Sequence, residues 1–252
     1  LRRFAARGQL DAELWSILAE PGVVRFLLGG LANTLKAAAG GMVGAVVIGA
    51  VMALGRLSRH RPVRWLAGLY VEFFRGFPLL LLILFSAFGL PRLGIRLPLF
   101  WYLVLGLAVY NSAVLAEIFR AGILSLDRGQ SEAARAIGLT DGQAMRLVVF
   151  PQALRRMAPA IVGQLVVLLK DTSLGYFVQY EELLRRAQIT GNFDANLLQA
   201  LLVAAAIYIG VNLALSRVAR RLEVRQKRRY GGTIDMAGGP EDLVAVETAT
   251  RR

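Results

Sequence analysis

The chain has 252 residues, of which 56% are hydrophobic and 19% are charged, and its mean hydropathy is +0.53. This balance excludes an ordinary water-soluble domain, in which about a quarter of the residues are charged. The sequence has no cysteine and one histidine, His60, which excludes disulfide frameworks and thiolate metal sites and nearly excludes zinc or Ser-His-Asp chemistry. The net charge of +13 suits binding to nucleic acid, to an acidic partner or to a membrane surface. The distribution of the basic residues along the chain distinguishes these three kinds of partner.

A segment of about 20 mostly apolar residues is long enough to span a membrane as a helix. Five segments meet this condition, and we expect spans at about 31–55, 65–90, 97–118, 157–180 and 195–216. Residues 1–26 lack the pattern of a signal peptide, so we expect insertion through internal segments. The sequence therefore predicts an all-α membrane protein with five transmembrane helices.

The basic residues are concentrated in alternate connections. Runs of arginine and lysine follow the first, third and fifth predicted spans, whereas the other two connections hold two arginines each. Because cytoplasmic loops are enriched in Lys and Arg, we expect a transmembrane domain over 31–222, with the segment 1–30 outside and both the loop 124–156 and the tail 223–252 in the cytoplasm. Four arginines before the first span argue against this orientation: Arg2, Arg3, Arg7 and Arg25.

Two further expectations follow from this distribution. The basic residues lie at helix ends and form no single stripe interleaved with aromatic residues, so we expect membrane lipid and no nucleic acid as a partner. The tail is Gly-rich and non-periodic, which predicts disorder.

The loop between the third and fourth predicted spans is amphipathic and compatible with helix. We expect Ser131 to cap a short helix that Gly138 ends in a left-handed conformation. Thr140 or Asp141 is expected to cap a second helix, which Pro151 stops. The loop therefore predicts a helix–glycine–helix elbow that can dock against another surface.

The order of residues in this loop resembles the EAA loop of permease subunits of ABC importers. The matching positions are Glu132, Ala133, Ala134, Gly138, Val148, Phe150 and Pro151. The family pattern ends in Ile-x-Leu-Pro, so Val148 and Phe150 are conservative departures. Flanking segments resemble the polar amino-acid branch of the same family: VEFFRGFPLL at 71–80, AEIFRAGI at 116–123, FPQALRR at 150–156 and LKDTSL at 169–174.

The resemblance implies the MetI-like type I ABC importer permease fold and the role of transmembrane subunit in an ATP-driven, binding-protein-dependent importer of polar amino acids. It implies a location in the bacterial inner membrane, in contact with lipid. The partners that it implies are two cytoplasmic ATPase subunits, a second permease subunit that is identical or homologous, and an extracytoplasmic solute-binding protein. The chain has no phosphate-cradling Gly-Lys-Ser/Thr loop. We therefore expect no enzyme activity and no cofactor on this chain, with ATP and Mg on the partner ATPase.

In the family, the first elbow helix inserts into a groove on the ATPase, and a short Ala-rich helix suits a rigid coupling element. The expected coupling residues are Glu132, Ala133, Ala134, Arg135, Ile137, Gly138 and Pro151. The alternative interpretation is that 131–151 merely form an amphipathic helix at the membrane interface.

Two acid–base pairs lie within or near the predicted spans. Glu72 and Arg75 share a helical face and can pair, and Glu117 and Arg120 repeat the spacing. We interpret all four as locks between helices near the inner interface. The alternative is a gate, in which Glu72 and Arg75 belong to the substrate pathway.

The segment Lys170-Asp171-Thr172-Ser173 interrupts the fourth predicted span near its middle. A central site could use Lys170 for the carboxylate of an amino acid and Asp171 or the hydroxyls of Thr172 and Ser173 for its ammonium group. The alternative is that the two charges pair with other helices. The lysine slightly favours glutamate or a related acidic or amide amino acid.

Two other classes of function fit parts of the sequence. An ion-coupled transporter or a channel would explain buried charges but would work without an ATPase and has no use for the elbow. A membrane enzyme would need an acid–base or metal constellation, which His60 does not supply.

Overall fold

The computed structural model describes residues 11–230, and every regular element in this range is a helix. The long helices are α3 (Pro21–Leu57), α4 (Arg61–Gly76), α6 (Leu99–Leu124), α9 (Phe150–Asp171) and α11 (Leu197–Tyr230). The shorter α-helices are α2 (Ala12–Ser16), α5 (Leu79–Leu84), α7 (Arg128–Ala136), α8 (Asp141–Ala144) and α10 (Leu183–Phe193). Tighter 3₁₀ turns cover Ile17–Ala19, Leu90–Leu93 and Thr172–Val178, and wider π turns cover Phe85–Gly89 and Met145–Val149. The expected all-α fold class is confirmed.

Four helical stretches are long and apolar enough to cross a membrane: Pro21–Leu57, Leu99–Leu124, Asp141–Val178 and Leu197–Arg225. A fifth candidate is the bent pair Arg61–Gly76 and Leu79–Leu93, whose axes differ by 101°. The bend replaces the straight helix expected over 65–90, because Pro78 lacks an N–H and disfavours helical geometry in the residue before it. These four or five candidates agree with an expectation of five spans.

Several helices extend beyond the spans expected from hydropathy. α3 begins at Pro21, so the last third of the segment 1–30 already belongs to this helix. α11 continues through the basic residues to Tyr230, because Arg, Lys, Glu and Gln are good helix formers. The first part of the tail 223–252 is therefore helical, while residues 1–10 and 231–252, including the predicted disorder, lie outside the described residues.

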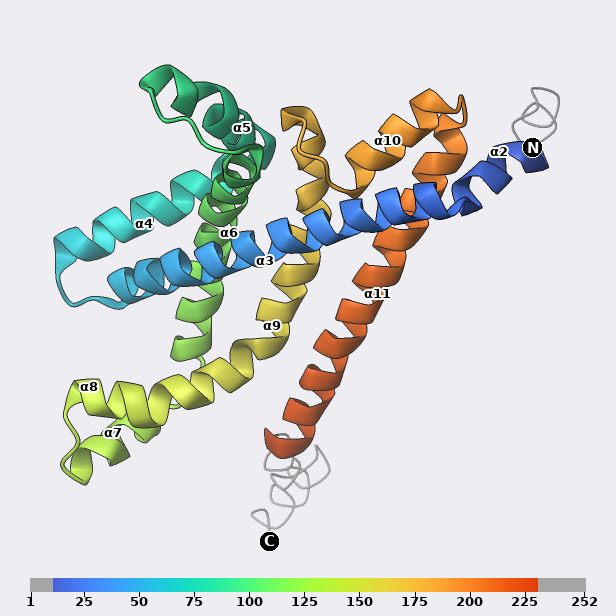
Figure 1. Ribbon diagram of the computed structural model, residues 1–252. Coiled ribbons are helices and arrows are strands. Elements are labelled where there is room, and N and C mark those ends of the chain that lie inside the picture. The colour runs from blue at the N-terminus through green and yellow to red at the C-terminus, as the bar shows by residue number, and fades with distance from the viewer. Residues whose placement is uncertain (1–10, 231–252) are drawn as a thin grey trace, which may run out of the picture.

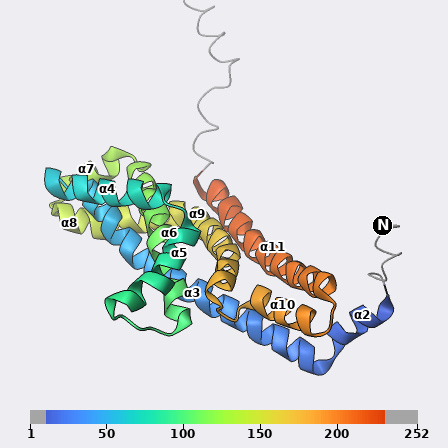
Figure 2. The same cartoon turned by 90° about the horizontal axis from the view of Figure 1, so that it is seen from above.

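α3 is the longest helix and crosses the bundle obliquely, packing on α6, α9 and α10 (Figure 1). α5 and α10 lie at one end of the bundle, and α7, α8 and the C-terminal end of α11 lie at the other. The view from above shows α10 and α11 beside the N-terminal half of α3, and α4, α7 and α8 at its C-terminal end (Figure 2). The elbow thus lies at the end of the bundle opposite α10.

Close approach of α3 and α6 depends on a stripe of small residues. Ala37, Gly41, Ala45, Gly49 and Ala53 recur at every fourth position of α3, and all are buried. A Cβ added at Gly49 would lie 2.9 Å from the carbonyl oxygen of Ser112 on α6. Such spacing of small residues lets backbones pack closely in a membrane, where van der Waals contact stabilises helix pairs.

We expect Gly49→Ala to destabilise the protein by about 1–3 kcal/mol, because the added methyl group meets backbone that cannot move aside cheaply. The matched control is Gly163→Ala in α9, where an added Cβ has no neighbour within 4 Å and helix propensity favours alanine. Thermal unfolding of the purified variants in detergent checks this. Equal melting temperatures for both variants would contradict the close contact.

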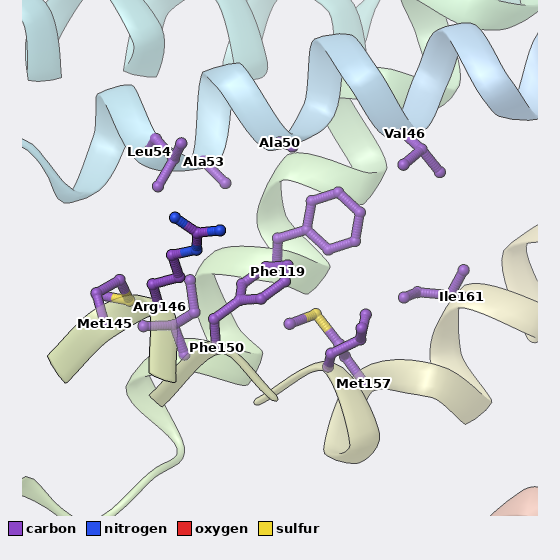
Figure 3. A pocket seen from close by; sticks show the side chains of 12 residues that line it. Val46, Ala50, Ala53, Leu54, Phe119, Met145, Arg146, Phe150, Met157 and Ile161 are labelled. Atoms are coloured by element: carbon purple, nitrogen blue, oxygen red, sulfur yellow. The ribbon is translucent and has the colours of Figure 1, made fainter. Parts of the chain in front are cut away.

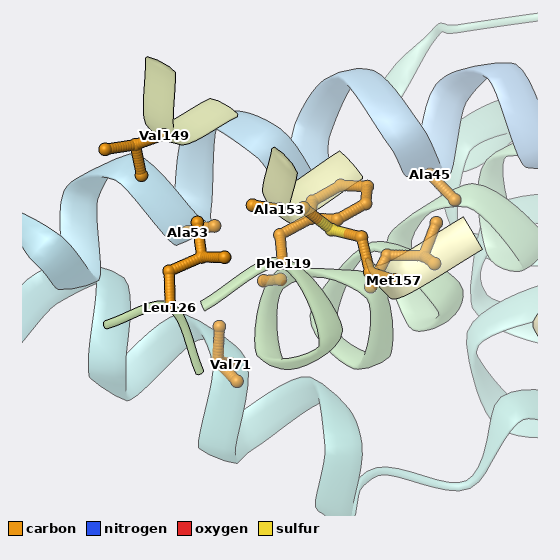
Figure 4. Packing of buried hydrophobic residues seen from close by; sticks show 10 residues of the cluster. Ala45, Ala53, Val71, Phe119, Leu126, Val149, Ala153 and Met157 are labelled. Atoms are coloured by element: carbon orange, nitrogen blue, oxygen red, sulfur yellow. The ribbon is translucent and has the colours of Figure 1, made fainter. Parts of the chain in front are cut away.

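One apolar cluster joins the elbow to the spans (Figure 4). Its members come from α3, α4, α6, the connection after α6, the π turn Met145–Val149 and α9, and include Ala53, Val71, Phe119, Val149, Ala153 and Met157. Val149 and Ala153 are buried, so the second half of the elbow and the start of α9 form part of the same packed unit as the membrane helices. Closely packed side chains transmit a displacement of one helix to its neighbours.

Candidate functional site: the elbow and the polar clusters

The first elbow helix, α7, begins one turn earlier than expected. Its N-cap is Asp127, whose side chain accepts a hydrogen bond of 2.8 Å from the Gly129 backbone N–H. The expectation that Ser131 caps this helix is wrong, because an equally good cap precedes it and Ser131 lies inside α7.

Gly138 ends this helix as expected. Its φ is +88°, a left-handed conformation that costs an L-residue energy and glycine none. The Gly138 N–H donates to the Arg135 carbonyl at 2.9 Å, and the Leu139 N–H donates to the Ala134 carbonyl at 3.2 Å. These two bonds satisfy the last carbonyls of the helix and fix a sharp turn.

The second elbow helix also starts as expected, but it does not stop at Pro151. Thr140 forms a reciprocal capping box with Gln143, with hydrogen bonds of 3.3 and 2.9 Å. The chain then passes through the π turn Met145–Val149 directly into α9, with Pro151 in its first turn. The predicted stop is wrong because proline is tolerated where a helical segment begins, and the π turn shifts the hydrogen-bond ladder just before it.

α7 presents one continuous exposed face. Glu132, Ala133 and Ala136 are exposed, and the Ile137 side chain is 80% exposed. Positions 132 and 136, and 133 and 137, are one turn apart, so acidic, small and apolar groups share this face. Ala134 differs: it is 3% exposed, on a helix that packs against α8 and the π turn. Ala134 therefore stabilises the elbow itself and does not offer a surface to a partner.

Asp141 ties the elbow to the connection between α3 and α4. Its carboxylate lies 2.9 Å from an Arg59 guanidinium nitrogen and 3.6 Å from one of Arg135. Arg135 also donates to the Ser131 carbonyl at 3.2 Å. The Arg135 side chain therefore contacts both elbow helices, through Ser131 of α7 and Asp141 of α8. Sequence reasoning considered Asp141 only as a helix cap, since nothing local indicates its partner Arg59. These pairs are exposed, so each contributes at most about 1 kcal/mol.

A second ionic cluster joins α3 to α6. Glu117 accepts from Arg56 at 2.8 Å and pairs with Arg120 as the spacing predicts. Glu72 forms no ion pair with Arg75 within residues 11–230, so the predicted pairing is wrong. Both side chains are exposed, and an ion pair in contact with water contributes little free energy of stabilisation. Glu72 instead lines a polar pocket of about 400 Å³ with Arg56 and Arg120 of this cluster and with Arg64.

The segment 170–173 lies at a helix end and not within a continuous helix. α9 ends at Asp171, and the chain continues as the 3₁₀ turn Thr172–Val178. Lys170 is exposed and Asp171 and Ser173 are partly exposed, whereas the buried Thr172 hydroxyl donates to the Leu169 carbonyl at 2.6 Å. In the part of the chain that the structure describes, no hydrogen bond or ion pair brings this segment to Glu72 or Arg75. The six predicted pathway residues thus form two separate groups.

Sequence reasoning missed a buried carboxylate at the other end of the bundle. Glu182 is fully buried and N-caps α10, accepting from the backbone N–H groups of Leu184 and Arg185 at 2.8 and 2.7 Å. The Tyr208 hydroxyl of α11 donates to the same carboxylate at 2.6 Å. Burial raises the pKa of Glu182 above its usual value, and these three hydrogen bonds offset that rise only in part. The sequence signal for this site is a polar residue directly before the amphipathic helix α10. Glutamate is an uncommon N-cap, so this signal is weak.

We expect Tyr208→Phe to destabilise the protein by about 1.5–3 kcal/mol, because it removes a hydrogen bond to a buried charged acceptor. Tyr110→Phe is the matched control, since no hydrogen bond of the Tyr110 hydroxyl is found in the described residues. Thermal unfolding of both variants measures the difference. The assigned bond is refuted if the two substitutions have the same effect.

Known proteins match this chain along most of its length. The family described as binding-protein-dependent transport system inner membrane component matches residues 45–228. The glutamate transport system permease protein GluD of Corynebacterium glutamicum is 38% identical over 229 residues, which are 89% of this chain and 83% of the relative. The probable glutamine ABC transporter permease protein GlnP of Bacillus subtilis is 41% identical over 204 residues, which are 80% and 94% of the two chains.

Solved structures share the fold. The crystal structure of an amino acid ABC transporter with histidines contains a chain that matches with a TM-score of 0.76 and 34% identity, over 83% of this chain and 98% of that one. An inward-facing MetNI methionine ABC transporter matches with a TM-score of 0.60 at 21% identity, over 81% and 98%. The resemblance and the MetI-like fold inferred from the loop and its flanking motifs are confirmed. The chain belongs to the family of binding-protein-dependent transport system inner membrane components, and it is an amino-acid ABC transporter permease.

Proposed function

We propose that the chain is the transmembrane subunit of an importer that couples ATP hydrolysis on partner subunits to the passage of polar amino acids. The exposed face of α7, closed by the left-handed Gly138, carries this proposal. It offers a small, rigid surface of acidic, alanine and isoleucine side chains that a complementary groove can hold. Relatives named as glutamate and glutamine permeases support glutamate or a related acidic or amide amino acid as the substrate.

Coupling follows from how the elbow is built. Movement of a docked ATPase displaces α7, and the turn at Gly138 passes this displacement to α8. The π turn runs without a break into α9, and the cluster around Val149 and Met157 packs α9 against α3 and α6. A displaced elbow therefore moves membrane helices as a unit, which supports coupling roles for Glu132, Ala133, Arg135, Ile137 and Gly138. Pro151 and Ala134 act by shaping the elbow.

The proposed assembly contains two ATPase subunits, two permease subunits that are identical or homologous, and an extracytoplasmic binding protein, in the bacterial inner membrane. The chain binds no cofactor in this proposal, and ATP with Mg belongs to the ATPase. We place the elbow and the end of α11 in the cytoplasm and the segment 1–30 outside, because the arginines cluster at the elbow end of the bundle. The family membership argues against a channel that works without an ATPase.

We assign the end of α9 to the substrate pathway, with Lys170 facing the substrate carboxylate and Asp171, Thr172 or Ser173 facing the ammonium group. Glu72 and Arg75 belong to a separate polar region in this account. Because Lys170 is exposed, Lys170→Met should leave folding intact. We expect it to raise the KM for transported glutamate about tenfold, the effect of losing one charge-assisted hydrogen bond. The matched control is Lys36→Met, because Lys36 is an exposed lysine on α3. This substitution should leave the KM unchanged.

The proposed function is tested by uptake of labelled glutamate and glutamine into proteoliposomes that contain the complete complex, with ATP inside or outside. We expect accumulation that requires both the binding protein and ATP on the ATPase side. Uptake that proceeds at the same rate without ATP would contradict the proposal and favour the channel or ion-coupled alternative.

A further inference from the structure

An apolar groove with a volume of about 460 Å³ lies between α3, α6 and the start of α9 (Figure 3). Aliphatic, aromatic and methionine side chains line it, among them Val46, Ala50, Leu54, Phe119, Phe150 and Met157. Arg146, on the π turn, is the one charged residue of this lining in the described part of the chain. Such a site suits a hydrocarbon chain with a negative group at one end.

The surface of the groove is apolar throughout, and the guanidinium of Arg146 lies beside one end of it. Figure 3 shows Val46 and Ile161 at one end and Leu54 with Arg146 at the other. Val46 and Leu54 are eight residues apart on α3, a distance of about 12 Å along a helix. A single leaflet contributes about half of the roughly 30 Å hydrocarbon core. The groove is therefore about 12 Å long, which is less than the thickness of one leaflet, and its cation lies at the end nearest the elbow.

Arg146 is available for an external anion. Its side chain is exposed, and within residues 11–230 it forms no ion pair. In Figure 3 its guanidinium is directed toward α3, beside Ala53 and Leu54. A guanidinium group binds phosphate oxygens with two parallel hydrogen bonds, and basic pockets between helices at the cytoplasmic side bind lipid headgroups.

We propose that the groove is a binding site for an anionic glycerophospholipid, with one acyl chain along the groove and the phosphate at Arg146. The charge at one end and the apolar length together favour a lipid over a protein segment. Assignment to the cytoplasmic leaflet rests on the proposed orientation, whereas the site itself does not.

The full chain is reconstituted in phosphatidylcholine vesicles that contain phosphatidylglycerol with a photoactivatable diazirine on its acyl chain. After illumination, mass spectrometry of peptides locates the adducts. We expect adducts on α6 and α9 at residues of the groove, such as Phe119 and Met157. Arg146→Gln should reduce these adducts about tenfold, the effect of losing a charge-assisted bond, whereas Arg155→Gln, an exposed arginine outside the groove, should not.

A second pair of variants tests the apolar length independently. Ala50→Trp fills the groove and should abolish the adducts on Phe119 and Met157, whereas Val43→Trp, at a 66% exposed position of α3 outside the groove, should leave them. Equal labelling of both tryptophan variants overturns the proposal. It is also overturned if Ala50→Trp breaks the association of permease subunits while lipid labelling stays unchanged, since a second protein chain would then occupy the groove.

Discussion

Replacement of Glu132 by lysine should reduce ATP-dependent uptake at least about tenfold while the protein remains folded. Glu132 is exposed on α7, so its loss removes no internal contact. Reversal of its charge places a cation where the proposed ATPase groove receives an anion, and like charges that face each other across an interface cost several kcal/mol. The measurement is uptake by proteoliposomes, together with the amount of ATPase that co-purifies with the permease.

Glu13→Lys is the matched control, because Glu13 is an exposed acidic residue of α2, away from the elbow. It should retain normal uptake and normal ATPase binding. If Glu132→Lys also retained both, α7 would not be the docking element. Loss of uptake with ATPase binding intact would move the role of Glu132 from docking to transmission of movement.

Glu117→Leu is expected to destabilise the protein by about 2–4 kcal/mol. The carboxylate pairs with both Arg56 and Arg120, and the three side chains are only 21–30% exposed. Removing one partner of a largely buried ion pair leaves charge without compensation, which is costlier than the pair itself is stabilising. Because α3 and α6 are held by this cluster, unfolding monitored in detergent should shift to lower temperature.

Asp141→Leu provides the matched comparison, since Asp141 also pairs with two arginines but is 58% exposed. Its substitution should cost no more than about 1 kcal/mol, because water solvates the arginines that remain. A cost at Asp141 equal to that at Glu117 would show that burial does not determine the strength of these clusters.

The elbow illustrates which features local sequence can predict. The left-handed turn at Gly138 and the cap at Thr140 depend on residue types within four positions, and both are confirmed. The start of α7 was misplaced because Asp127 and Ser131 are both good caps. The sequence predicts a stop at Pro151 because the π turn before it has no sequence signal of its own.

Contacts between distant residues account for what sequence could not predict. Helical spacing predicts the same pairing for Glu72 with Arg75 as for Glu117 with Arg120. It gives no sign of Arg56, which only the packing of α3 on α6 brings to Glu117. Likewise, the burial of Ala134 and of Glu182 depends on neighbours elsewhere in the chain. Hydropathy located the apolar segments but not the bend before Leu79 or the extension of α11, since both concern helix geometry and not polarity.

The most direct test of the central claim uses the absence of native cysteine from the chain. Ala133→Cys, on the exposed face of α7, and Leu93→Cys, at a 77% exposed position of the connection after α5, are each labelled with a maleimide photocrosslinker in the complete complex. The account predicts a covalent adduct with the ATPase subunit from Ala133→Cys alone. An ATPase that co-purifies with the permease but is never crosslinked from position 133 would contradict it.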